Sequence, residues 1–298
     1  MTNDRVNGIV REAMVAGLFY PEAGPELLWA VDSSLEAAEA TSHAPPPSAA
    51  SAAAPGAAPP RGARCILSPH GGFSYSSLAQ ARAWRELKGR PPSRVVVLGP
   101  WHGATEQGVF LPESTIFRTP LGDLRVDDEI CDELESSGTV FVRNDIPHME
   151  EHSIELQLPF MKRLFPDALL IPILIGGHDR RLTASLARAL DLTIEEYGGS
   201  IAVVASSNLS SAFEPAEAAA RSDRIIAALE RGDAEALAND EGRELGFGSA
   251  VLAAVVGLHC MRDLSFTLLK RIDSIKARGD EHERIVHYAA GAWYPKEG

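Results

Sequence analysis

The sequence predicts an α/β fold: a single domain in which a central sheet, mostly parallel or mixed, is flanked by helices. Two observations lead to this prediction. After residue 62, short apolar runs bounded by Pro, Gly or Ser alternate with longer amphipathic stretches. Runs that are apolar at every position are typical of strands buried on both faces, and strand–helix alternation favours a parallel sheet. The 298 residues, of which 45% are hydrophobic, can form one extensive core, so we treat residues 1–298 as one domain.

The expected elements follow one another along the chain. A helix is expected at 25–40, where Leu27, Leu28, Val31 and Leu35 recur at helical spacing. Four strands are expected at 64–68, 94–99, 169–175 and 200–206. Helices are expected at 78–87, 127–135, 180–196 and 215–231. The last apolar run, 284–293, alternates weakly, and we expect it to be a closing edge strand.

Residues 41–62 differ in composition from the rest of the chain. Nineteen of these 22 residues are Ala, Pro, Ser or Gly, and six are proline. Such a segment buries too little apolar surface to offset the entropy lost on ordering. We expect a flexible insertion within the domain rather than a boundary between two domains.

Charge and cysteine usage exclude several classes of protein. The chain has 28 Lys and Arg against 41 Asp and Glu, a formal net charge of -13, which repels nucleic acid and anionic lipid. The longest apolar run, 250–258, is far shorter than the roughly 18 residues needed to cross a bilayer. Three scattered cysteines without a CxxC motif are typical of a reducing compartment, so we expect a cytoplasmic protein. We expect Cys65 in a strand and Cys131 and Cys260 on helices, all buried.

Candidate site residues follow the predicted strands. In a parallel sheet, ligands bind beyond the carboxyl ends of the strands, and His70, His102 and His178 each follow one. Neutral imidazoles are good ligands for zinc, iron and copper, so we predict that His70 and His102, both flanked by Gly and Pro, form a metal pair. The alternative for each is a hydrogen bond to its own loop. For His178, which precedes Asp179 at a helix start, we favour a solvated capping region.

The densest polar cluster spans 150–160. On a helix, His152 and Glu155 would share a face, and either could orient an imidazole ligand or relay a proton. We predict catalytic roles for both residues and a kink at Pro159. An equally weighted alternative is a cap in which Glu155 reaches back to the backbone of His152.

Six sequence blocks occur in the order found in the Memo family. They are REAMVAGLFYP at 11–21, SPHGGFSY at 68–75, LGPWH at 98–102, TPLG at 119–122, EHSIELQLPF at 151–160 and YAAGA at 288–292. The chain therefore resembles Memo proteins, known in prokaryotes as AmmeMemoRadiSam system protein B, over nearly its whole length apart from the Ala/Pro-rich segment. The resemblance implies a fold similar to class III extradiol dioxygenases, with a site at the strand ends. It also implies association with other AmmeMemoRadiSam system proteins.

The resemblance also implies a ligand set from which this chain departs. In the family, two histidines and one cysteine can bind iron or copper, and the histidines match His70 and His102. The cysteine position is Leu245, and Asn208 and Ser211 stand where an aspartate and a further histidine are usual. Because catalytic metal sites use about three protein ligands, we expect a degenerate site that binds iron or copper weakly.

Two functions follow from these expectations. The first is a non-catalytic binding or scaffold protein whose crevice takes a small molecule or a peptide, with Trp101 and Phe73 as apolar walls. The second is a metal-dependent redox or dioxygenase-like enzyme that uses His70 and His102 with a third ligand, such as Glu155 or a substrate group. An apolar crevice with Leu245 pointing into it favours binding, whereas a third protein ligand favours the enzyme.

Overall fold

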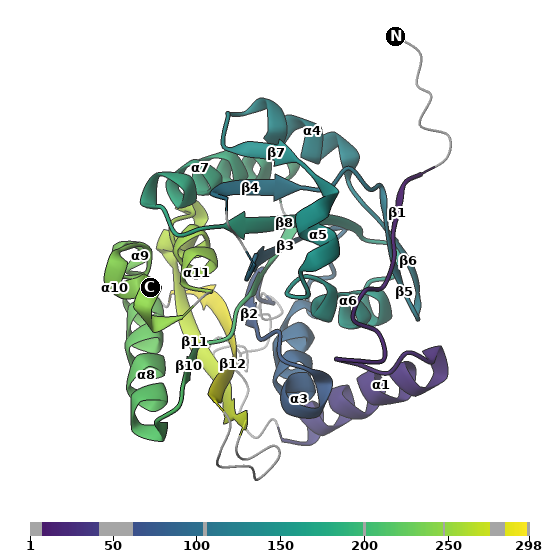
Figure 1. The fold of residues 1–298 in the computed structure, drawn as a ribbon, viewed down its shortest axis with the longest axis horizontal. Coiled ribbons are helices and arrows are strands. Elements are labelled where there is room, and N and C mark those ends of the chain that lie inside the picture. Colours follow the sequence, from purple (N-terminus) through teal and green to yellow (C-terminus); the bar gives the residue numbers. More distant parts are fainter. Residues whose placement is uncertain are drawn as a thin grey trace, which may run out of the picture.

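The computed structural model describes residues 8–41, 62–103, 106–198, 201–246, 248–274 and 284–296. Helices lie on both sides of a nine-stranded mixed sheet (Figure 1). Its strands in spatial order are β10 (Ser210–Ala212), β12 (Ile285–Pro295), β2 (Cys65–Ser68), β9 (Ile201–Ser206), β3 (Arg94–Pro100), β8 (Leu169–Gly176), β4 (Gly108–Leu111) and β7 (Phe141–Arg143), and β11 (Leu264–Asp273) pairs with β12. A smaller sheet contains β1 (Val10–Arg11), β5 (Ile116–Thr119) and β6 (Gly122–Arg125).

The α-helices match most of the predicted amphipathic stretches. They are α1 (Gly24–Ala40), α3 (Phe73–Trp84), α4 (Asp128–Ser136), α5 (Asp145–Glu150), α6 (Leu158–Leu164), α7 (Arg180–Tyr197), α8 (Pro215–Arg231), α9 (Ala234–Ala238), α10 (Asp240–Leu245) and α11 (Ser249–Val256). Short 3-10 helices are η2 (Arg85–Leu87), η3 (Glu155–Gln157) and η5 (His259–Asp263). The α/β prediction is confirmed. No helix in the described part of the chain is both long and apolar enough to cross a membrane.

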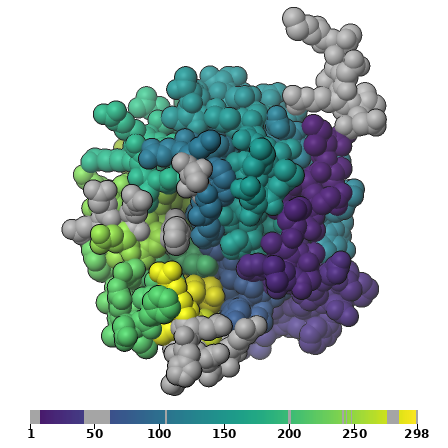
Figure 2. Space-filling view, viewed as in Figure 1, coloured from purple at the N-terminus to yellow at the C-terminus, as the bar shows by residue number. Residues whose placement is uncertain are grey.

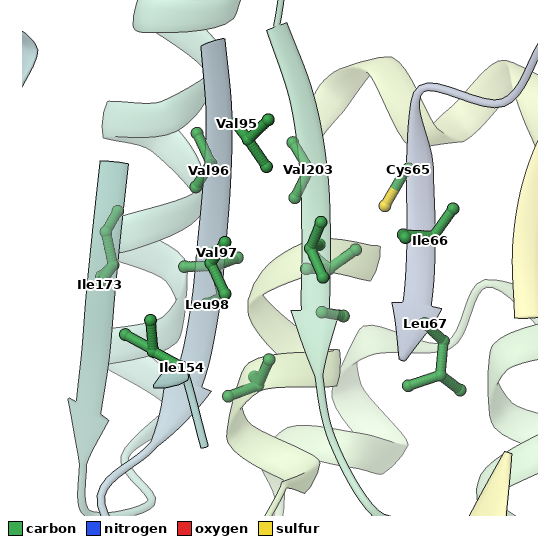
Figure 3. Packing of buried hydrophobic residues seen from close by; sticks show 14 of the residues in the cluster. Cys65, Ile66, Leu67, Val95, Val96, Val97, Leu98, Ile154, Ile173 and Val203 are labelled. Carbon is green, nitrogen blue, oxygen red and sulfur yellow. The ribbon is translucent and has the colours of Figure 1, made fainter. Parts of the chain in front are cut away.

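The four predicted strands form the parallel centre of the sheet. β2, β9, β3 and β8 run parallel, whereas β4 pairs antiparallel with β8 and β12 pairs antiparallel with β2. Figure 3 shows Leu98 of β3 near Ile173 of β8, its partner in register, and both side chains are fully buried. Burying an aliphatic side chain of this size stabilises the fold by about 1.5–3 kcal/mol. These strands therefore form a well-packed support for the loops that follow their carboxyl ends.

The prediction that residues 284–293 form an edge strand is wrong. β12 lies inside the sheet, because Trp293 pairs with Cys65 of β2 on one side and with Phe266 of β11 on the other. β11 was not predicted, because its sequence includes Lys270 and Arg271 and so lacks a continuous apolar run.

Two further predictions concern the linker and the cysteines. Residues 42–61, nearly the whole predicted insertion, lie outside the described residues, and Thr41 is the C-cap of α1.

Cys65 and Cys131 are buried as predicted. Cys260 is exposed, contrary to prediction, because it lies in the short surface turn η5 rather than on a packed helix.

Candidate functional site

Three histidines meet beyond the carboxyl ends of the parallel strands β2 and β3, which lie on either side of β9. His70 follows β2, His102 follows β3, and His152 lies in the loop before η3. The ring centroid of His102 is 5.1 Å from that of His70 and 5.0 Å from that of His152, and the His70 and His152 centroids are 5.8 Å apart. The strand ends bring the predicted pair together and add His152 as a third imidazole.

Glu151, which was not among the predicted site residues, orients two of these rings. Its carboxylate accepts hydrogen bonds from the backbone amides of His102 (2.6 Å), His152 (2.8 Å) and Ser153 (2.8 Å). It also lies 3.0 Å from Nδ1 of His102 and 3.1 Å from Nδ1 of His152. Burial alone would raise the pKa of Glu151, but hydrogen bonds from His102 and the charges of His102 and His152 lower it to about 2. The group is therefore an ionised carboxylate that fixes the Nδ1–H form of His102.

The tautomer of His70 follows from the hydrogen bonds of Ser206. The Ser206 hydroxyl donates to the carbonyl of Ser153 (2.6 Å) and accepts from Nε2 of Gln157 (3.0 Å). The single hydroxyl hydrogen of Ser206 is therefore already donated to Ser153. In the contact between Ser206 and Nδ1 of His70, 3.2 Å long, Nδ1 is the donor. Burial, followed by the nearby His102 and His152, lowers the pKa of His70 well below its usual range. His70 is a neutral imidazole whose Nε2 carries the lone pair.

His152 does not lie on the predicted helix. It is in a loop, η3 begins at Glu155, and Pro159 lies in the first turn of α6 instead of kinking a longer helix. Proline is favoured in the first turn of a helix, because an amide hydrogen there has no intrahelical acceptor. The ring of His152 stacks on Phe19 with centroids 4.8 Å apart, and burial lowers its pKa.

Glu155 anchors the N-terminal segment. Its carboxylate accepts hydrogen bonds from the Tyr20 hydroxyl (2.6 Å), the backbone amides of Val15 (3.0 Å) and Met14 (3.1 Å), and the buried guanidinium of Arg11. Figure 2 shows this segment, in purple, running along the surface of the teal part of the chain. The predicted cap from Glu155 to the His152 backbone is wrong, since Glu151 takes that amide hydrogen. Glu155 makes no hydrogen bond to an imidazole among the described residues, but its charge acts on His152 by raising the pKa of that ring, against the larger effect of burial.

A cavity of about 380 Å³ opens beside His70 and His102. Its other walls are formed by Asn208, Leu209, Ser210, Ser211, Arg221, Glu244, Leu245, Gly246, Gly248, Arg284 and Val286. Asn208 also accepts a hydrogen bond from the backbone amide of His70 (3.0 Å), which fixes the loop after β2. Asn208, Ser211 and Leu245 thus line the same cavity as His70 and His102.

The two predicted aromatic walls lie elsewhere. Trp101 packs edge-on against Phe110, with ring centroids 5.2 Å apart. Phe73 is buried against Tyr20 and Phe160. Neither lines the cavity, because both rings are taken up by packing among the helices and strands.

His178 is separate from the histidine cluster. Its Nε2 lies 2.8 Å from the Ser249 hydroxyl and 3.1 Å from the Leu237 carbonyl, and Asp179 supplies the cap of α7. His178 is only half-buried, but it bridges α9 and α11 rather than facing solvent alone.

His102, Glu151 and His152 form a group that could hold a metal ion, with ligand atoms within 4.8 Å of one another. His70 is not part of that group. The oxygens of Glu151 already accept three backbone amide hydrogens, and Leu245 lines the cavity where the resemblance implies a thiolate. No cysteine is found among the described lining residues. The residues present therefore do not fit the two-histidine, one-cysteine iron or copper centre.

Comparisons with known proteins agree with the sequence blocks. The family model described as Memo-like protein matches residues 11–295. A MEMO1 family protein of Aeropyrum pernix is 32% identical over 237 residues, covering 76% of this chain and 79% of the relative. One from Thermotoga neapolitana is 26% identical over 289 residues, covering 95% and 99%. The crystal structure of the uncharacterized protein JW3007 from Escherichia coli K12 gives a TM-score of 0.46 at 14% identity, covering 76% of this chain and 98% of that one. The family model and the relatives together confirm the predicted resemblance: this chain belongs to the Memo-like protein family.

Proposed function

We propose that this chain is a non-catalytic, small-molecule-binding member of the Memo-like family whose metal site is degenerate. The observation that carries the proposal is Leu245, which is 4% exposed and lines the cavity together with His70 and His102. An alkyl side chain there removes one metal ligand and one negative charge from the site. Iron or copper would be held weakly, because neutral imidazoles alone do not offset the charge of a divalent ion.

The same cavity suits an organic ligand. Its volume of about 380 Å³ falls within the range of roughly 300–1,000 Å³ that is usual for small-molecule sites. Leu209, Leu245 and Val286 provide apolar surface, and Asn208 and Ser211 provide polar groups. Neutral His70 offers Nε2 as a hydrogen-bond acceptor, so a hydroxyl or amine of the ligand would be recognised there. This pattern of apolar walls with a few convergent polar groups is typical of binding pockets.

A second candidate, a metal-dependent enzyme, is favoured by the orientation of the rings. The Nδ1 of His70 donates to Ser206, and Nδ1 of His102 faces Glu151. In both rings Nδ1 is therefore engaged by a neighbouring side chain, the arrangement that ligating histidines usually show. Iron or copper held by His70 and His102 with a third ligand would supply redox or Lewis-acid chemistry at the cavity.

Metal titration separates the two candidates. Metal-free protein is titrated with ferrous ion under anaerobic conditions and with cupric ion, by calorimetry and by elemental analysis after gel filtration. We expect weak binding and less than one equivalent retained, with little change in His70→Ala. One equivalent bound tightly by the wild-type protein and lost in His70→Ala would contradict the proposal and support the enzyme.

A further inference from the structure

Two arginines line the cavity that contains His70 and His102. Arg221 belongs to α8, and Arg284 directly precedes β12. Glu244 is the only carboxylate among the described lining residues, and it is exposed. The two guanidinium groups give this cavity cationic hydrogen-bond donors, although the averaged field of the chain repels anions.

Arg284 has no carboxylate partner among the described residues. Its guanidinium carbon lies 5.5 Å from the ring centroid of Phe213, a side chain that is 71% exposed. By contrast, Arg94 bonds to Asp127 at 2.7 Å and Arg163 to Asp32 at 2.7 Å. The aromatic contact positions Arg284 but leaves its N–H donors for another acceptor.

Arg221 is held in place from its own helix. Its guanidinium bonds to Glu217, one turn earlier on α8, at 2.6 Å. A single carboxylate uses at most two of the five N–H donors of an arginine, so Arg221 keeps donors for a ligand. Planar guanidinium groups bind carboxylate and phosphate oxygens through paired hydrogen bonds, which makes them the side chains best suited to such anions.

We infer that the cavity takes a small organic anion, with a carboxylate or phosphate group recognised by Arg221 and Arg284. The apolar body of the ligand packs on Leu245 and Val286, and its hydrogen-bond donor faces His70. This inference rests on the proposed function, because it names the class of molecule that the same cavity binds. The apolar lining limits the ligand to one charged end, since a second anionic group would have no cationic partner there.

Three probes of matched shape test the inference: cyclohexanecarboxylate, cyclohexyl phosphate and the neutral cyclohexanecarboxamide. Calorimetry at 0.15 M salt is expected to show at least one anion binding about tenfold or more tightly than the amide, as a charge-assisted pair of hydrogen bonds allows. Whichever anion binds more tightly distinguishes a carboxylate from a phosphate ligand. Equal affinities for the amide and both anions would overturn the inference, as would no binding of either anion at 10 mM.

Variants assign the recognition to the arginines. Arg284→Gln and Arg221→Gln are each expected to weaken anion binding by about five- to fiftyfold and to leave amide binding unchanged, whereas Arg284→Lys retains part of the affinity. The control is Arg180→Gln, whose side chain pairs with Glu235 on the surface outside this cavity. Anion affinities that are unchanged in both cavity variants would overturn the inference.

Imidazole NMR separates failure of the inference from failure of the proposed function. If the amide shifts the His70 and His102 resonances as strongly as the anions do, the cavity binds small molecules without charge recognition. The proposed function then stands and the inference falls. If wild-type protein retains one tightly bound metal ion, the proposed function falls whatever the probes show.

Discussion

The carboxylate of Glu151 lies 3.0 Å from Nδ1 of His102 and also accepts a hydrogen bond from the backbone amide of the same residue. Main chain and ring of His102 are thus held by one buried anion. Since Glu151 also accepts the amides of His152 and Ser153, it ties the loop after β3 to the loop before η3. The geometry of the imidazole cluster therefore depends on a residue that need not touch a ligand.

Replacing Glu151 by Gln should lower the free energy of unfolding by about 2 kcal/mol, because a buried acceptor of several hydrogen bonds is lost and an amide NH₂ faces backbone donors. The Nδ1–H form of His102 should also lose its preference. Chemical denaturation and imidazole ¹⁵N NMR measure the two effects. Glu150→Gln changes the exposed neighbouring residue and should change neither. Equal effects of the two variants would contradict the role given to Glu151.

Replacing Glu155 by Gln should cost about 3–5 kcal/mol, because it leaves the buried charge of Arg11 without its counter-ion. The matched control is Glu12→Gln, which removes a half-exposed partner of Arg118 and should cost less than about 1 kcal/mol. Thermal and urea unfolding give both values. A smaller loss for Glu155→Gln than for Glu12→Gln would show that the N-terminal segment is not anchored there.

His148 predicts a specific dependence of stability on pH. Burial, with the charge of Arg11 adding to it, lowers its pKa to about 3, and its Nε2 lies 3.1 Å from the carbonyl of Phe110. Below the unfolded pKa of about 6.5, the unfolded chain binds a proton that the folded protein excludes. Stability should therefore be fully present above pH 6.5 and fall towards pH 3, by up to about 1.4 kcal/mol per pH unit from this group.

The His148→Gln variant, which keeps a donor for Phe110, should flatten that part of the pH profile. Urea unfolding between pH 4 and pH 7 measures the slope. His259→Gln, which replaces an exposed histidine, should leave the slope unchanged. The same slope in wild-type protein and His148→Gln would assign the acid sensitivity to other groups.

Filling the cavity should abolish binding of small molecules. Leu245→Trp places a large ring where a buried leucine lines the cavity. A screen of small neutral fragments, read by shifts of the His70 and His102 imidazole resonances, should give hits with wild-type protein and none with the variant. Leu245→Met conserves the volume, should cost less than about 1.5 kcal/mol of stability, and should retain the hits. Fragments that bind Leu245→Trp as well as wild-type protein would place the binding site elsewhere.

The sequence predicts the central parallel strands and the pair of histidines His70 and His102, and it does so for the same physical reason. Strands buried on both faces are apolar at every position, and parallel strands end at one edge, so His70 and His102 could be placed together from their positions just after two predicted strands. Glu151 was missed because the cluster fits a helical pattern, in which the i and i+3 residues His152 and Glu155 share a face. The backbone there is a loop.

The remaining contacts depend on chain segments far apart in the sequence. Arg11 and Glu155 are separated by 144 positions, so no local pattern shows that they form a buried pair. Arg284 and Arg221 likewise line the same cavity as His70 and His102 only because β12 lies inside the sheet next to β2 and α8 packs beside it. With 284–293 predicted as an edge strand, nothing in the sequence indicated that Arg284 lies beside this cavity.

Restoring the thiolate tests the central claim most directly. Leu245→Cys supplies the missing ligand beside His70 and His102, and Leu245→Ser provides a side chain of similar size without a thiol. Calorimetric titration with cupric and ferrous ion should show weak binding by the wild-type protein and Leu245→Ser. Leu245→Cys should bind one equivalent at least about tenfold more tightly, because the thiolate adds a bond and a negative charge. Tight one-to-one binding by the wild-type protein, with no gain in Leu245→Cys, would contradict the account.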